Sequence, residues 1–301
     1  MAESNWGTAI KIILVLVVLS FIAAAFLSVS IGEDNADGNI AIIPIKGVIS
    51  TEGSGLFDQQ VASSAEIVSL IEKASKNPEI KAIILEINSP GGAPVATEEI
   101  ANAIESTDKM TVAWIREIGT SAGYWVASSA DKVVASRMST TGSIGAIMSY
   151  LDFSGLLDDY NVTYQRLVAG QYKDIGSPFR HLTINEQQIM QKYLDRMHEY
   201  FIKAVAINRN MTVEQVREVA TGMFFLGEEA KELGLVDELG GKAEAVKIIE
   251  NQLNITAVTV QYSHEPTLGE ILGDVFSKQS FYVGKGIGSS LLDAGSSKIR
   301  I

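Results

Sequence analysis

The chain has 301 residues, of which 47% are hydrophobic and 20% are charged, and it carries a formal net charge of −12 with no cysteine. This length is sufficient for one large domain or two small ones. The absence of cysteine excludes thiol catalysis, cysteine metal sites and disulfides. The excess of acidic residues argues against nucleic acid as a partner, because binding to phosphates requires a basic surface.

Residues 12–31 form an uncharged apolar run, IILVLVVLSFIAAAFLSVSI. A helix of this length spans the roughly 30 Å hydrocarbon core of a bilayer. A cleaved signal peptide is the alternative, but the run is longer than the usual apolar region of about 7–15 residues and no clean cleavage site follows it. We therefore expect one N-terminal transmembrane helix that is retained as an anchor.

Basic residues near this helix predict its orientation. Lys11 precedes the helix, whereas no Lys or Arg occurs between Ile31 and Lys46. Basic residues are enriched on the cytoplasmic side of a membrane. We expect a single-pass protein of the cell membrane with a cytoplasmic N-terminus and an extracytoplasmic main domain.

The composition divides the chain into five parts. The polar run GEDNADGN has the composition of a linker, and a Gly/Ser-rich stretch over residues 284–297 indicates a flexible tail. The expected parts are a cytoplasmic N-terminus (1–11), a transmembrane anchor (12–31), a linker (32–39), a main domain (40–262) and a C-terminal tail (263–301).

Hydrophobic periodicity predicts alternating strands and helices along the main domain. The expected strands cover residues 40–44, 47–50, 80–87, 110–115, 133–135, 163–168 and 257–262. The expected helices cover residues 62–76, 95–106, 124–130 with an opening near Ser121, 185–207, 212–219, 228–233 and 241–253. This order is typical of an α/β fold with a largely parallel sheet and flanking helices.

The first candidate catalytic segment is TSAGYW, which follows the predicted strand 110–115. Ser121 would lie at a helix N-terminus, among unpaired backbone N–H groups that can stabilise an oxyanion. The small residues Ala122 and Gly123 allow close approach of a substrate backbone. The alternative is that Ser121 or Thr120 is only a helix N-cap.

The second segment is NSPGGAP, directly after the predicted strand 80–87. Its two glycines allow the backbone to turn and to expose N–H groups, which suits an oxyanion hole or an edge that binds an extended peptide. The alternative is an ordinary strand-to-helix turn. The segment matches neither the phosphate-binding loop nor the GxGxxG pattern.

The third segment is GQYKDIGSP, which contains Lys173. A lysine acts as a general base only when it is uncharged, and burial favours that state. The alternative is an exposed lysine paired with Asp174.

Other catalytic arrangements are less well supported. The three histidines, His181, His198 and His264, lie in no recognisable motif, so a Ser-His-Asp triad is disfavoured. No HExxH motif or cluster of metal ligands is visible, and we expect neither a metal nor another cofactor.

Five segments in order, SPGG, TSAGYW, TGSIGAI, QYKDIGSP and FFLGEEAKELGLVDELGG, resemble the signal peptide peptidase A family in its short, single-domain form. The resemblance covers about residues 40–250. It implies a fold related to Clp protease and the crotonases, and a membrane-anchored serine endopeptidase that forms ring- or dome-shaped homo-oligomers. The implied substrates are signal peptides left in the membrane after secretion.

The resemblance also implies the roles of five residues. Ser121 would be the nucleophile and Lys173 the general base, 52 residues later in the chain. Ser143 would orient the lysine amine, and the backbone N–H groups of Gly92 and Ala122 would form the oxyanion hole. Relatives often have glycine at the position of Ala122, but the backbone N–H is the group that acts there.

Two alternatives come from other classes of protein. A crotonase-like acyl-CoA enzyme would use the same oxyanion geometry without a serine nucleophile, but a membrane anchor and the lack of a basic site for CoA phosphates count against it. A non-catalytic membrane scaffold would retain the fold, but the presence of Ser121, Ser143 and Lys173 counts against it.

Overall fold

A computed structural model of the chain describes residues 11, 14–16, 19–20, 38–52 and 61–263. The expected anchor (12–31), N-terminus (1–11), linker (32–39) and tail (263–301) therefore lie wholly or largely outside the described residues. Within the described residues, no helix has both the length and the apolar character needed to cross a membrane.

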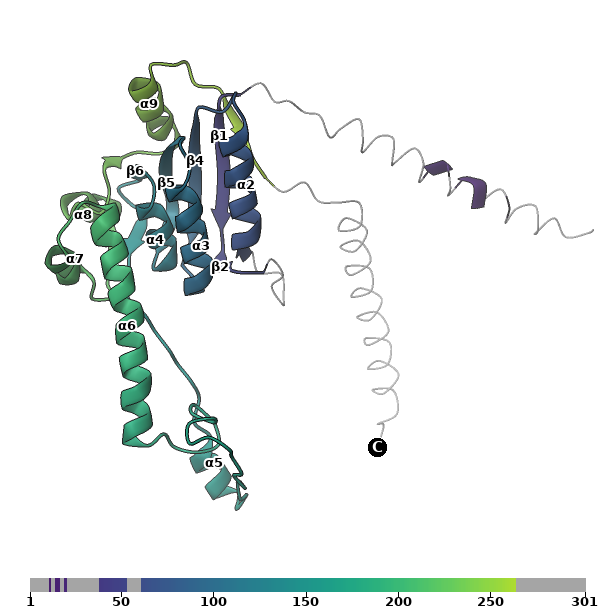
Figure 1. The fold of residues 1–301 in the computed structure, drawn as a ribbon, viewed down its shortest axis with the longest axis vertical. Helices are drawn as coiled ribbons and strands as arrows, with labels where there is room; N and C mark the ends of the chain where they lie inside the picture. The colour runs from purple at the N-terminus through teal and green to yellow at the C-terminus, as the bar shows by residue number, and fades with distance from the viewer. Residues whose placement is uncertain (1–10, 12–13, 17–18, 21–37, 53–60, 264–301) are drawn as a thin grey trace, which may run out of the picture.

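The core is a mostly parallel sheet with the strand order β10-β1-β4-β5-β6-β9 (Figure 1). Strand β7 pairs with β5 in parallel, and β8 pairs with β7 in the one antiparallel pairing of this sheet within the described residues. The α/β fold with a largely parallel sheet is thus confirmed. The strands are β1 (Ile40–Lys46), β2 (Val48–Ser50), β3 (Val61–Ser63), β4 (Ala82–Ser89), β5 (Met110–Thr120), β6 (Lys132–Ala135), β7 (Thr140–Gly142), β8 (Phe224–Leu226), β9 (Glu238–Leu239) and β10 (Thr259–Gln261).

Side chains alternate between the two faces of the central strands, as the period of a strand requires. On β4, Ile83, Leu85 and Ile87 join the larger core cluster. That cluster contains residues of α2 (Ser64–Lys76), α3 (Pro94–Glu105) and α4 (Ala122–Ser128). Ala82 and Ile84 pack on the other face with residues of α9 (Lys242–Leu253). Covering both faces explains the continuous apolar sequence of the inner strands.

Helix α6 (Ile184–Asn208) is the longest element, with 25 residues. Its C-terminal part packs on the body through four buried residues, Phe201, Ile202, Val205 and Ala206. Its N-terminal part projects away from the sheet together with the preceding segment and α5 (Ser154–Asp159) (Figure 1). We call residues 145–200 the arm; only Glu186 within it is buried. Helices α7 (Val213–Val219) and α8 (Gly227–Glu232) complete the fold.

The structure departs from the sequence-based prediction in a few elements. The strand expected at residues 163–168 is wrong, because every residue of this segment is exposed on the arm and the segment has no partner strand in the described part of the chain. Strand β5 continues five residues beyond the predicted end, to Thr120, where it pairs with β7. The short elements β7, β8 and α5 were not predicted.

Candidate active site

Ser121 lies at a sharp turn between β5 and α4. Its φ and ψ are 53° and −126°, in a region that L-residues rarely adopt and that often marks a functional site. The backbone N–H of Ser121 donates to the carbonyl of Gly142 at 2.8 Å, and its carbonyl accepts from the N–H of Tyr124 at 2.9 Å. Its side chain makes no capping hydrogen bond, so the alternative of a simple N-cap is not supported.

The Gly-Gly turn after β4 lies directly against this serine. Gly91 has a φ of +112°, and a Cβ at this position would lie 2.9 Å from the Cβ of Ser121 and 3.0 Å from the amide nitrogen of Ala122. The hydroxyl of Thr120 donates to the carbonyl of Pro90 at 3.1 Å, joining the two strand ends. The first two predicted segments therefore meet at the carboxyl end of the sheet, where open α/β folds place their sites.

Two backbone N–H groups beside Ser121 are available to a ligand. Those of Gly92 and Ala122 donate no hydrogen bond to any residue that the structure describes. The neighbours of Gly92 are held in place, because the N–H of Ile49 donates to Gly91 at 2.9 Å and the N–H of Ala93 donates to Ile49 at 2.8 Å. Fixed, unpaired donors next to a serine are the requirement for an oxyanion hole.

Ser143 directly follows β7, the strand whose last residue accepts the hydrogen bond from the N–H of Ser121. The N–H of Ser143 donates to the carbonyl of Met223 at 2.8 Å, and its hydroxyl donates to the carbonyl of Gly222 at 3.1 Å. It is one residue from Gly142, the acceptor for Ser121. Ser143 and Ser121 thus lie on adjacent strand ends, with Ser143 half-buried.

Within one chain, Lys173 does not lie near Ser121 and Ser143. It is exposed in a turn on the arm, where its N–H donates to the carbonyl of Gly170 at 3.1 Å. Its amine has no ion pair or hydrogen bond with the residues described here. Asp174, the expected partner in the alternative interpretation, binds Arg166 and Arg180 instead.

Helix α6 separates the two predicted catalytic residues within one chain. Trp125, on the helix that begins after Ser121, stacks on Phe201 of α6. Near Lys173, the hydroxyl of Tyr172 accepts from the amide of Asn185, in the first turn of α6. Sixteen helical residues separate positions 185 and 201, about 24 Å at 1.5 Å per residue. This distance is far beyond the reach of a lysine side chain.

Neither of the two described histidines, His181 and His198, forms an alternative triad. His181 binds the carboxylate of Asp152 at 2.6 Å, but the hydroxyl of Ser154 donates to that same carboxylate at 2.5 Å. Both ring nitrogens of His181 are 3.2–3.3 Å from this hydroxyl, so neither is singled out as its base. His198 contacts the carbonyl of Ile144 through Nε2 at 3.2 Å, and His264 lies outside the described residues.

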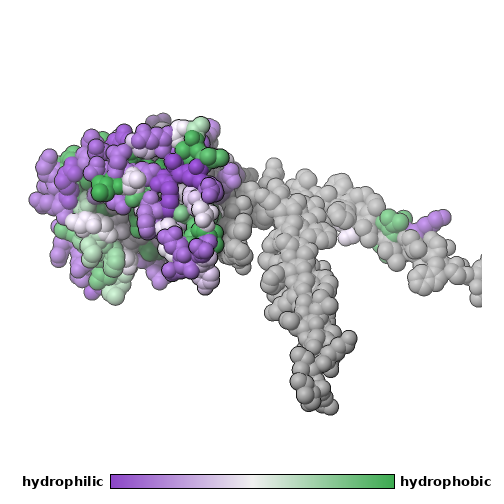
Figure 2. Space-filling model, turned by 90° about the horizontal axis from the view of Figure 1, so that it is seen from below, coloured by the Kyte–Doolittle hydropathy of each residue, from purple (hydrophilic) through white to green (hydrophobic). Residues whose placement is uncertain are grey.

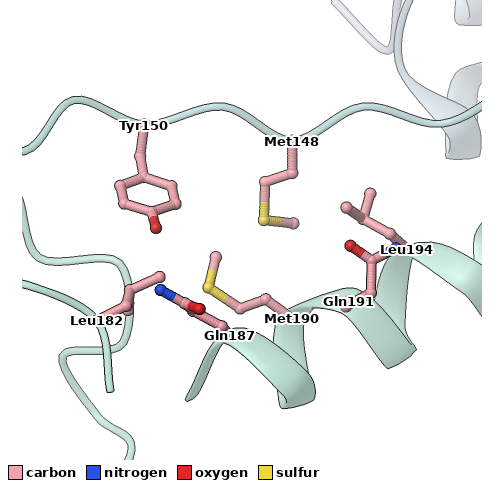
Figure 3. A pocket seen from close by; sticks show the side chains of 7 residues that line it. All are labelled: Met148, Tyr150, Leu182, Gln187, Met190, Gln191 and Leu194. Atoms are coloured by element: carbon pink, nitrogen blue, oxygen red, sulfur yellow. The ribbon is translucent and has the colours of Figure 1, made fainter. Parts of the chain in front are cut away.

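A hollow of about 180 Å³ with both polar and apolar lining residues lies on the arm. Figure 3 shows Met148 and Tyr150, from the extended segment after β7, pointing toward Gln187 and Met190 of α6. Neither Ser121 nor Lys173 lines it. The hollow is therefore not the peptide-binding site of the predicted nucleophile within this chain.

Some residues of the site are not marked by any of the sequence motifs. The Gly-Gly pair predicts a turn but gives Gly91 no role of its own, because its close contact with Ser121 depends on β4 and β5 being neighbours. Arg166 and Arg180, which hold the segment around Lys173, were also missed. The Thr183-x-x-Glu186 capping-box pattern was a visible signal for the anchoring point of this segment.

Comparisons with known proteins agree with the fold and identify the family. The profile of peptidase family S49 matches residues 103–256, about half of the chain. The candidate protease MJ0651 of Methanocaldococcus jannaschii is 32% identical over 293 residues, covering 94% of this chain and 92% of that protein. The candidate signal peptide peptidase SppA of Enterococcus faecium is 31% identical over 240 residues, covering 78% of this chain and 70% of that protein.

A solved structure supports the same fold. It is a lysine-to-alanine mutant of 1510-N, a membrane-bound stomatin-specific protease, in complex with a substrate peptide. The TM-score is 0.51 at 17% identity, over 81% of this chain and 99% of that one. The family profile and the relatives, which extend over most of the chain, show that the chain belongs to peptidase family S49 and is a serine protease.

Proposed function

We propose that the chain is a membrane-anchored serine endopeptidase with a Ser–Lys dyad, in which Ser121 is the nucleophile and Lys173 the general base. The observation that carries this proposal is the turn at Ser121. A serine in a strained conformation, with no side-chain capping hydrogen bond, lies beside the N–H groups of Gly92 and Ala122, which donate no hydrogen bond within the described part of the chain. This is the arrangement that acyl transfer requires.

The mechanism proceeds through an acyl-enzyme. Lys173 accepts the proton of the Ser121 hydroxyl as its oxygen attacks the peptide carbonyl. The N–H groups of Gly92 and Ala122 stabilise the oxyanion, and Ser143 orients the lysine amine. Lys173 then protonates the leaving amine, and a water molecule, deprotonated by the same lysine, hydrolyses the ester.

The two members of the dyad come from different copies of the chain. Lys173 projects on the arm, some 24 Å along α6 from the helix of Ser121, so it cannot reach the serine of its own chain. The arm of a second copy can bring Lys173 into the space beside Ser121 and Ser143. The active enzyme is thus a homo-oligomer whose sites lie between copies.

The surface of the arm supports this assembly. Many large apolar side chains are exposed on it, among them Leu167 at 98% and Ile147 at 90%. Figure 2, which views the molecule from the side toward which the arm projects, shows patches of hydrophobic residues among the hydrophilic ones. A surface segment with many exposed large apolar side chains is typical of a protein–protein interface.

The proposed substrates are signal peptides left in the membrane after secretion, and other apolar peptides. The name of the Enterococcus faecium relative, a candidate signal peptide peptidase, supports this choice. An enzyme anchored at the bilayer by residues 12–31 would meet such peptides where they accumulate.

A serine-reactive fluorophosphonate probe tests the proposed function directly. We expect the probe to label wild-type protein at Ser121 and to leave the Ser121→Ala variant unlabelled, since only this serine has both the proposed general base and the oxyanion hole beside it. The two alternatives, a crotonase-like acyl-CoA enzyme and a non-catalytic scaffold, both predict no labelling at Ser121.

The membrane topology is tested separately. We propose that residues 1–11 lie in the cytoplasm and that Ser121 and Lys173 lie outside the membrane, because Lys and Arg are absent between Ile31 and Lys46. Protease added to intact spheroplasts should degrade the main domain while a cytoplasmic marker survives. Full protection that is lost only on lysis would invert this topology.

A further inference from the structure

The turn that carries Lys173 is tied to α6 on both sides of the lysine. Before it, the hydroxyl of Tyr172 accepts from the amide of Asn185 at 2.9 Å. After it, Asp174 binds Arg180, which in turn binds Glu186. Asn185 and Glu186 both belong to the first turn of α6. The two residues that flank Lys173 are therefore anchored on one short piece of helix.

The anchor after Lys173 is a network of four charged side chains. Arg166 donates to both carboxylate oxygens of Asp174, at 2.6 and 2.7 Å. Arg180 donates to the same carboxylate at 3.0 and 3.2 Å, and to Glu186 at 2.9 and 2.7 Å. Paired contacts between guanidinium and carboxylate groups fix orientation as well as distance.

The network is well shielded for a projecting segment. The side chain of Glu186 is 6% exposed and that of Asp174 is 15% exposed. Hydrogen bonds from Arg166 and Arg180 hold the pKa of Asp174 well below its usual range. Hydrogen bonds from Arg180, and then from the backbone N–H of Thr183, lower the pKa of Glu186 to about 2. Both carboxylates are thus charged at neutral pH and keep the network intact.

We propose that the network of Arg166, Asp174, Arg180 and Glu186 positions Lys173 for catalysis by fixing its turn on the first turn of α6. None of the four side chains touches the reacting atoms in this scheme; each acts through the backbone on either side of the lysine. The amine itself has no hydrogen bond or ion pair with described residues of its own chain, so it is available to the site of a second copy. This inference rests on the proposed dyad.

A positioning role has a kinetic signature that differs from that of substrate binding. Replacing Asp174 with Asn keeps the shape of the side chain but removes the charge that holds two arginines. We expect kcat to fall about ten- to a hundredfold, because a misplacement of about 1 Å can have this effect. The KM should stay near that of the wild type, and Asp174→Glu should recover part of the lost kcat.

A cross-linking measurement reports the position of the turn without relying on activity. The chain has no native cysteine, so Ser121→Cys chains and Lys173→Cys chains can be assembled together and treated with a short bis-maleimide. We expect a cross-link between the two kinds of chain. Adding Asp174→Asn to the Lys173→Cys chain should lower the yield of this cross-link.

The matched control is a second arginine–carboxylate pair, which joins α6 to α7. Arg217 binds both carboxylate oxygens of Glu199, at 3.1 and 2.9 Å, near the other end of α6. Glu199→Gln should leave kcat unchanged and should leave the cross-link yield unchanged when added to the Lys173→Cys chain.

Several results would overturn the proposal. The network has no positioning role if Asp174→Asn keeps wild-type kcat and cross-link yield while Lys173→Ala is inactive; the proposed dyad would then still stand. If Asp174→Asn fails to assemble, Arg166→Gln, which leaves Arg180 between the two carboxylates, replaces it in both measurements. Failure of that variant to assemble as well would assign the network to assembly rather than to positioning. Normal turnover of Lys173→Ala would instead refute the dyad itself.

Discussion

The rings of Trp125 and Phe201 stack with their centroids 5.1 Å apart and an interplanar angle of 16°. This contact fixes α4, the helix that begins after Ser121, to the C-terminal half of α6. Because the turn of Lys173 is held at the opposite end of α6, one helix sets the distance between the proposed nucleophile and the proposed base within a chain. That distance excludes a dyad formed by a single copy.

Removing either member of the dyad should have nearly the same effect. We expect Ser121→Ala and Lys173→Ala each to lower peptide hydrolysis by about three orders of magnitude or more, since groups that act as a unit are not additive. Both variants should fold, because neither side chain makes a hydrogen bond within the part of the chain described. Steady-state rates together with circular dichroism check this prediction, and near-normal turnover of Lys173→Ala would assign the base to another residue.

A methyl group on the turn behind Ser121 should damage the site. Gly91→Ala places a carbon 2.9 Å from the Cβ of Ser121 at a φ of +112°, and we expect a loss of about 1–3 kcal/mol in stability from the backbone alone. Fluorophosphonate labelling of Ser121 should also fall. Gly155→Ala is the control: it has no atom within 4 Å of the new carbon, lies in α5, and should gain up to about 1 kcal/mol.

Acidification should weaken the network of ion pairs that holds the turn containing Lys173. The pKa of Glu186 is lowered to about 2 in the folded chain, against about 4.3 for an unfolded chain. A lowered pKa means that the stabilisation is complete above the unfolded value and is lost as the pH falls toward the folded value. Its loss should therefore occur between about pH 4.5 and pH 2.

The matched variant for this pH dependence is Glu186→Gln, which preserves the capping box but removes the charge. Wild-type protein should unfold at a higher temperature than the variant at pH 6, and the difference should shrink as the pH falls through 4 to 3. A difference that stays constant over this range would show that the charge of Glu186 does not contribute.

The fold and half of the site followed from local sequence features. The apolar run that became β4 and the amphipathic pattern that became α6 are long and periodic, so burial determines their type. The helix after Ser121 and the turn at Gly91 and Gly92 were predicted because small residues follow buried strands there. Their contact is a consequence of adjacent parallel strands, since the carboxyl ends of such strands meet at one edge of the sheet.

The remaining features of the fold and the site depend on tertiary contacts, which hydrophobic periodicity does not reveal. Strand β7 has only three residues, and its pairing with the end of β5 is set by tertiary packing rather than by local propensity. The segment at 163–168 has strand-like composition, but its side chains are exposed on the arm and find no partner strand among the described residues. The separation of Lys173 from Ser121 could not be predicted either, because it follows from the direction in which α6 projects from the body.

Subunit complementation measures most directly whether the dyad forms between copies. Full-length Ser121→Ala and Lys173→Ala chains, each inactive alone, would be co-expressed with different tags and purified through both. A site that takes its serine from one chain and its lysine from another is restored in a mixed oligomer. After selection for both tags, random mixing should recover from about a quarter of wild-type activity in a large ring to about half in a dimer. A mixed oligomer as inactive as either parent would show that Ser121 and Lys173 act within one chain or do not act together.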